Sequence, residues 1–268
     1  MNILLIIIVT ILLTKTSFAL ILDLLKRGGS ISKNYRSQEI PYGYGLVYGL
    51  NFVIILVLGT LVGVYDLKVS TKFIILVLTM TLIGIIDDTL GRKDFQGFKG
   101  HLKALFCRRQ LTTGLLKMVF SFITVFYLFF YWSFNLFSSL LSTLIVLLGA
   151  NLINLLDLRP GRALKGFILL SGLIVLVGND FLFLVPILIM VLLSLPLDLK
   201  AEGMMGDVGA NLLGALWGLI FIINSTRLEQ LIVLSGLIIL NSYSEIYSLT
   251  NLIAGNRLLN FLDHWGRK

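Results

Sequence analysis

The sequence is poor in the residues that build disulfides, metal centres and charged surfaces. Cys107 is its one cysteine, which excludes an intramolecular disulfide and a cysteine-rich zinc site. The two histidines, His101 and His264, are far apart and do not have the spacing of metal ligands. Only 13% of the 268 residues are charged and 57% are hydrophobic, whereas a soluble domain carries about a quarter charged residues. The composition therefore predicts a protein with a large lipid-facing surface.

Long apolar runs make up most of the chain, separated by glycine, proline and polar clusters. A helix needs roughly 20 apolar residues to cross a bilayer. We therefore expect an all-α polytopic membrane protein with about nine transmembrane helices, forming one integral-membrane domain over residues 1–268. The first run has neither the basic start nor the cleavage site of a signal peptide, so we expect it to be an anchor. The sixth and seventh runs are short, and a bent hairpin is an alternative for them. The nine runs fall near residues 2–25, 45–65, 72–90, 113–132, 136–156, 165–179, 181–197, 208–224 and 230–249.

The distribution of Lys and Arg predicts the orientation in the membrane. Eighteen of these residues, with Lys117 at the start of the fourth run counted among them, fall in alternate loops and in the C-terminal tail, whereas the remaining loops hold only Lys68, Lys72 and Arg227, and Lys15 lies inside the first run. Because cytoplasmic loops are enriched in Lys and Arg, we expect the N-terminus outside and the C-terminus in the cytoplasm. The predicted cytoplasmic segments are residues 26–45, 87–113, 157–165, 198–207 and the tail 250–268.

Acidic residues gather at the predicted cytoplasmic ends of the apolar runs. Asp87, Asp88, Asp157 and Asp207 each lie where a run meets the cytoplasm. Ionisable groups at membrane depth usually face a polar cavity and often mark a site, although helix capping and topology are the alternative explanation. The adjacent pair Asp87 and Asp88 favours a site, because neighbouring carboxylates repel each other unless a cation intervenes.

The ligand types predict which cation this site binds. Carboxylates without a His or Cys cluster favour Mg²⁺, or Mn²⁺, over zinc. Mg²⁺ binds through one or two carboxylates together with substrate phosphates, so it implies a phosphorylated substrate. Cations in the same loops could clamp the phosphate oxygens; alternatively, they set the topology and contact lipid headgroups. These cations are Lys99, Lys103, Arg159, Arg162 and Lys165.

Four stretches in this order resemble the motifs of one enzyme superfamily. They are NYRSQEIPYGYG at 34–45, GIIDDTLG at 84–91 followed by QGFKGHLKAL, NLINLLD at 151–157, and GDVGANLLG at 206–214. The chain resembles the polyprenyl-phosphate N-acetylhexosamine-1-phosphate transferases, the glycosyltransferase family 4 type that includes phospho-N-acetylmuramoyl-pentapeptide transferase. The resemblance covers about residues 30 to 225.

The resemblance implies a reaction at the inner leaflet of a bacterial plasma membrane. The phosphate of undecaprenyl phosphate attacks the β-phosphorus of a UDP-N-acetylhexosamine, UMP leaves, and a lipid-linked diphospho-sugar for the cell envelope remains. By position, Asp87 and Asp88 would serve catalysis, and Asp207 with Asp88 would hold Mg²⁺. The resemblance implies partners of three kinds, namely polyprenyl phosphate, a nucleotide-sugar donor and membrane lipids, with no nucleic acid, and it leaves a homodimer open. The residues expected to bind substrate are Asn151, Asn154, Asp157, Arg159, Arg162, Lys103 and Lys165.

The sequence departs from the family at three points, one of which is that the family's usual tenth span has no counterpart among the nine predicted runs. The family continues its third motif as Asp-Gly-x-Asp-Gly, whereas Leu158 and Pro160 stand at the first Gly and second Asp positions here. The family's His-rich loop has no counterpart beyond His264 in the tail, which is either a partial substitute or a solvated residue. These departures favour a second hypothesis, a relative that binds polyprenyl phosphate or acts as a scaffold without catalysis. A transporter is the third alternative, disfavoured because the acids cluster at one interface.

Overall fold

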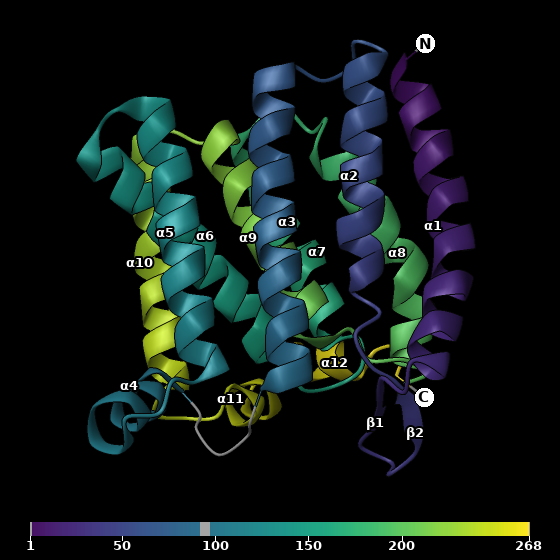
Figure 1. The fold of residues 1–268 in the computed structure, drawn as a ribbon, viewed down its shortest axis with the longest axis vertical. Helices are drawn as coiled ribbons and strands as arrows, with labels where there is room; N and C mark the ends of the chain where they lie inside the picture. The colour runs from purple at the N-terminus through teal and green to yellow at the C-terminus, as the bar shows by residue number, and fades with distance from the viewer. Residues whose placement is uncertain (1, 92–96, 268) are drawn as a thin grey trace.

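A computed structural model describes residues 2–91 and 97–267 and shows a bundle of long helices lying alongside one another (Figure 1). Short helices and a two-stranded hairpin gather at the end of the bundle where the chain terminates. Arg92, Lys93 and Asp94 of the predicted loop 87–113 lie outside the described residues, as do the side chains of Lys99 and His101. In chain order the elements are α1 Asn2–Arg27, β1 Ile31–Lys33, β2 Glu39–Pro41, α2 Leu46–Leu61, α3 Leu67–Leu90, α4 Gly97–Arg108, α5 Thr113–Ser133, α6 Leu136–Leu156, α7 Arg162–Val177, α8 Leu184–Leu199, α9 Gly206–Asn224, α10 Arg227–Ser244, α11 Leu249–Gly255 and α12 Arg257–His264.

Each predicted apolar run coincides with a helix, and the fold is that of an all-α, multi-pass membrane protein. Within the described residues, α1, α3, α5, α6 and α9 are long and apolar enough to cross a membrane. Helix α10 passes the same test together with α11, from which it is bent by 103°. Helices α2, α7 and α8 have 16 residues each, a length of about 24 Å at the usual helical rise.

The predicted cytoplasmic segments contain structure that the hydropathy pattern does not predict. Segment 26–45 holds the antiparallel pair β1–β2, in which Ile31 is opposite Pro41. The turn between these strands is held by the Asn34 side chain, which accepts the N–H groups of Arg36 and Gln38. The chain after β2 then lies against the start of α9, where the N–H of Gly43 donates to the carbonyl of Met204 at 2.9 Å. The hairpin is therefore attached to the end of the bundle that carries the acidic residues.

Helix α9 forms the centre of the bundle. Almost every residue from Gly206 to Phe221 is buried, as expected for a helix that is apolar on all sides. Small residues let its backbone approach two neighbours closely, which is how helices commonly pack in membranes. A Cβ added at Gly84 on α3 would lie 2.3 Å from the Cα of Val208, and one at Gly214 would lie 2.3 Å from the carbonyl oxygen of Gly149 on α6. The first turn of α9 is thereby held between α3 and α6.

We expect Gly214→Ala to destabilise the bundle by about 1–3 kcal/mol, because the added methyl group overpacks the contact between α6 and α9. The measurement is the thermal unfolding midpoint of the purified protein in detergent. Gly172→Ala on α7 is the matched control, since a Cβ there meets nothing within 4 Å, and it should be neutral or slightly stabilising. Equal midpoints for the two variants would contradict the close approach.

Candidate functional site

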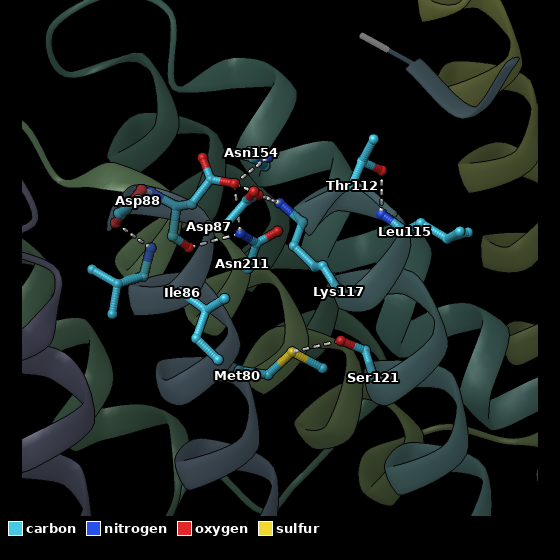
Figure 2. Close-up of polar contacts among 12 residues, drawn as sticks. Met80, Ile86, Asp87, Asp88, Thr112, Leu115, Lys117, Ser121, Asn154 and Asn211 are labelled. Carbon is cyan, nitrogen blue, oxygen red and sulfur yellow. Dashed lines mark hydrogen bonds and ion pairs between the residues drawn. The ribbon is translucent and has the colours of Figure 1, made fainter. Parts of the chain in front are cut away.

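The core of the candidate site is an ion-paired cluster of Asp87, Lys117 and Asp207. The Nζ atom of Lys117 on α5 lies 2.8 Å from Oδ2 of Asp87 on α3 and 2.5 Å from Oδ2 of Asp207 on α9. Figure 2 shows the ammonium group directed between the helices toward the carboxylates. The three side chains are largely shielded, with exposed fractions of 17–26%, so their charges are only weakly screened by solvent.

Asp88, the neighbour of Asp87, acts as a cap for α9. Its Oδ1 accepts the N–H of Asp207 at 2.9 Å, and its Oδ2 accepts the N–H of Val208 at 3.1 Å. The hydroxyl of Tyr42 donates to Oδ1 as well, at 2.8 Å. These bonds satisfy N–H groups that the first turn of a helix leaves without intrahelical partners. Asp88 therefore supports the first turn of α9 in this structure, and its predicted metal-binding role stays a prediction.

Two asparagines hold Asp207 in place. The Nδ2 atom of Asn211 donates to the backbone carbonyl of Asp207 at 2.7 Å and lies 3.4 Å from its Oδ2. The Nδ2 atom of Asn154 on α6 approaches the same Oδ2 at 3.5 Å (Figure 2). About one turn before Asn154 on α6, Asn151 donates to Asn241 on α10 at 2.6 Å. The structure thus brings the predicted motifs at 84–91, 151–157 and 206–214 into contact.

Asp157 and Asp198 form the next part of the site. Asp198 on α8 accepts the hydroxyl of Tyr44 at 2.7 Å and the N–H of Gly161 at 2.6 Å, which fixes the turn after α6. Asp157 lies in that turn, just beyond the end of α6. Burial, together with the negative charges of Asp198, Asp207 and Asp88, raises the pKa of Asp157 well above its usual value.

These residues line one cavity of about 1430 Å³ that has a polar end and an apolar arm. Within the described residues, six carboxylates and two cations, Lys117 and Arg159, line the polar end. The remaining carboxylate, besides the five aspartates above, is Glu245, which follows the last residue of α10. The arm runs along α5 and α6, where several lining side chains are exposed on the outer surface of the bundle. Its apolar lining includes Met118, Val119, Phe122, Ile123, Leu144 and Leu147.

Three predicted substrate ligands lie apart from this cavity. Lys103 is exposed on α4. Arg162 forms a two-pronged ion pair with the buried Asp263, with N–O distances of 2.8 and 2.9 Å. Lys165 donates to three backbone carbonyls in the tail, those of Leu262, Asp263 and Trp265. Arg162 and Lys165 therefore hold the C-terminal tail in this structure.

The tail is in turn connected to the cavity wall. Arg267 donates to Asp263 at 2.8 Å and, through Nε, to the carbonyl of Pro160 at 3.2 Å. Pro160 and Arg159 belong to the turn that lines the cavity. Although burial favours the neutral form, hydrogen bonds from Arg162 and Arg267 hold the pKa of Asp263 well below its usual value. His264 is exposed on α12 beside Asn260 and does not face the carboxylates.

Sequence reasoning missed Lys117, Tyr42 and Asn241 as site residues. Lys117 lies near the start of an apolar run and was assigned to topology, yet a lysine embedded in such a run usually faces a polar cavity. That rule was the available signal. Tyr42 and Asn241 carry no comparable signal, because tyrosine and asparagine are ordinary residues at membrane boundaries and in packed helices.

The geometry fits a Mg²⁺ ion only if substrate supplies part of its coordination. Among the described residues, no group of three or more His, Cys, Asp or Glu side chains could hold a metal by itself. Asp87 and Asp207 nevertheless present oxygens to one shared point, now taken by the Lys117 ammonium. Mg²⁺ typically binds through one or two carboxylates plus phosphate oxygens and water. Asp87 and Asp207 are thus the pair that would hold it.

Comparison with known proteins adds no further constraint. A scan against models of protein families and a search of characterised proteins returned no significant match. The functional assignment therefore rests on the side chains of this chain and their contacts.

We expect Asp263→Asn to release the tail, because it leaves two buried guanidinium groups without an anion, a loss of about 3–5 kcal/mol for a broken buried pair. Limited trypsin digestion should then cut at Arg257 faster than in the unaltered protein. Asp23→Asn removes an exposed ion pair with Arg27, worth less than about 1 kcal/mol, and should leave digestion unchanged. Protection of the tail in Asp263→Asn would argue against the ion-pair network as its anchor.

Asp157→Asn should stabilise the ligand-free protein at neutral and higher pH. A carboxyl whose pKa is raised by folding stabilises the fold at low pH, and this contribution is lost as pH rises through its folded pKa. The variant should therefore have a higher unfolding midpoint than the unaltered protein at about pH 8, and the difference should shrink toward about pH 4. A constant difference across this range would show that Asp157 does not titrate as described.

Proposed function

We propose that the chain transfers a phospho-sugar from a UDP-sugar to a polyprenyl phosphate, releasing UMP. The donor sugar in this proposal is an N-acetylhexosamine, and the product serves cell-envelope polysaccharide or peptidoglycan synthesis. The observation that carries the proposal is the cavity itself, in which a cluster of carboxylates and Lys117 continues into an apolar arm along α5 and α6. A substrate that matches both parts has a phosphate at one end and a long hydrocarbon chain at the other.

The charges in the cavity support a reaction that needs an added cation. A phosphate monoester is close to doubly charged at neutral pH, since its second pKa is about 6, so it needs no base to become a nucleophile. The obstacle is electrostatic, because the phosphate must approach a negatively charged diphosphate in a cavity where, among the described lining residues, carboxylates outnumber cations three to one. Mg²⁺ would supply charge neutralisation of the diphosphate and of the leaving UMP.

Each residue of the site has a role in the proposed reaction. Asp87 and Asp207 would hold the cation, while Asn154 and Asn211 orient the carboxylate of Asp207. Asp88 fixes the first turn of α9 through its backbone contacts. An oxygen of the lipid phosphate forms a bond to the β-phosphorus of the donor as the bond from that phosphorus to the UMP oxygen breaks. Water is excluded on one side by the apolar arm.

We place the reaction at the cytoplasmic face of a bacterial plasma membrane. In this arrangement α1, α2, α3, α5, α6, α7, α8, α9 and α10 cross the bilayer, with the N-terminus outside and the C-terminus in the cytoplasm. The support is the distribution of Lys and Arg, which are concentrated in the segments at the acidic end of the bundle. A nucleotide-sugar made in the cytoplasm reaches the cavity from that end.

A second function is favoured by two specific contacts. Asp88 accepts two N–H groups of α9 and the hydroxyl of Tyr42, and Arg162 is paired with Asp263 instead of lining the cavity. In the transferase proposal, Asp88 and Arg162 are residues that would bind metal or substrate. The alternative is a protein that binds polyprenyl phosphate, or a scaffold in envelope assembly, without transferring sugar phosphate.

The test is a release assay with purified protein, Mg²⁺, undecaprenyl phosphate and a panel of UDP-sugars, with UMP as the readout. We expect turnover with at least one donor, and a loss of at least about a hundredfold in Asp207→Asn because a metal-holding carboxylate is removed. Asp23→Asn on the exposed face of α1 is the matched control and should keep full activity. Lipid-phosphate binding without turnover would reject the transferase in favour of the binding protein, and full activity of Asp207→Asn would reject the assigned cluster.

A further inference from the structure

Lys117 occupies the one point that the oxygens of Asp87 and Asp207 share. Its ammonium contacts Oδ2 of both carboxylates, at 2.8 and 2.5 Å, and its side chain is 19% exposed. It reaches this point from α5, close to Asp87 (Figure 2), whereas Asp87 belongs to α3 and Asp207 to α9. Without it, two largely shielded carboxylates from different helices would face each other unpaired, an arrangement that folded proteins avoid.

An ammonium group and a divalent cation cannot both use these oxygens. Mg²⁺ binds carboxylate oxygens at about 2.0–2.1 Å, so an ion shared by Asp87 and Asp207 would fall where Nζ of Lys117 now lies. Two cations at such a separation repel each other strongly in a weakly screened site. Either the lysine or the metal holds the carboxylate pair at a given moment.

We propose that Lys117 is a built-in counter-ion that competes with the divalent cation for Asp87 and Asp207. This inference rests on the proposed function, which supplies the reason for a divalent cation at this point. Metal loading displaces the ammonium from the carboxylates, so Lys117 weakens metal binding in the ligand-free protein. A phosphate in the cavity offers the displaced ammonium a new partner, so phosphate and metal bind with positive coupling. Lys117 is therefore a positioning residue that makes metal binding depend on substrate.

The experiment measures Mn²⁺ binding to the ligand-free protein by electron paramagnetic resonance, without any turnover. Lys117→Met removes the competing charge and keeps the length of the side chain, so it should tighten Mn²⁺ binding by at least about tenfold. Lys117→Arg keeps the charge and should bind Mn²⁺ as weakly as the unaltered protein. Lys68→Met removes an exposed lysine at the opposite end of α3 and is the control for net charge, with no change expected.

A second measurement, the unfolding midpoint with and without Mn²⁺, tests the proposal if the variant is unstable. If Lys117→Met unfolds more readily because its carboxylates are unpaired, Mn²⁺ should raise its unfolding midpoint more than it raises that of the unaltered protein. Unchanged Mn²⁺ affinity in Lys117→Met, or instability that Mn²⁺ does not relieve, overturns the proposal. The coupling is tested by repeating the titration with undecaprenyl phosphate in detergent, which should tighten Mn²⁺ binding in the unaltered protein and have a smaller effect in Lys117→Met.

The outcomes separate this inference from the proposed function. If Lys117 competes with Mn²⁺ but no UMP is released, the counter-ion role of Lys117 is supported and only the transferase proposal is rejected. If UMP is released but Lys117→Met and the unaltered protein bind Mn²⁺ with equal affinity, the transferase proposal is supported and the counter-ion proposal is rejected.

Discussion

The position of the first turn of α9 is the constraint on which the site depends. Gly84 and Gly214 allow α9 to approach α3 and α6 at backbone distance, and this approach sets where Asp207 lies relative to Asp87. Asp88 then fixes the turn by accepting two of its N–H groups. Packing and hydrogen bonding here act on the same few residues, which is a common way for a protein to hold a functional group rigidly. The geometry of the candidate site and the stability of the bundle are consequently not independent in this molecule.

The described lining of the cavity carries more negative than positive charge. Carboxylates from α3, α6, α8 and α9 meet at one end of a bundle that is otherwise apolar, and burial of this kind is tolerated only with compensating partners. Tyr44 and the N–H of Gly161 compensate Asp198, and Lys117 compensates two carboxylates at once. Burial and the neighbouring charges of Asp198, Asp207 and Asp88 raise the pKa of Asp157. Among the described residues, the carboxylates that line the cavity therefore outnumber its cations.

Sequence reasoning predicted the helices and the meeting of the aspartate motifs, and it failed where partners are distant in sequence. Long apolar runs specify helices through their own composition, so every predicted run coincides with one. Arg162 and Asp263, by contrast, are separated by 101 positions, and no local pattern pairs them, so Arg162 and Lys165 were predicted to bind substrate. The hairpin β1–β2 and helices α4, α11 and α12 are too short or too polar for hydropathy to reveal. From sequence, Lys117 counts among the cations that predict membrane orientation, because a lysine at the end of an apolar run fits the enrichment of cytoplasmic loops in Lys and Arg equally well.

The attachment of the tail to the turn after α6 has a consequence for biosynthesis. Arg267 donates to Pro160 and Asp263, so the turn that lines the cavity is held by residues that leave the ribosome long after Asp87, Asp157 and Asp207. Synthesis proceeds at roughly 5–20 residues per second, so the nascent chain spends several seconds with its acidic residues in place and their surroundings unfinished. The helices that carry the acidic residues are therefore synthesised before the tail that holds the turn between α6 and α7.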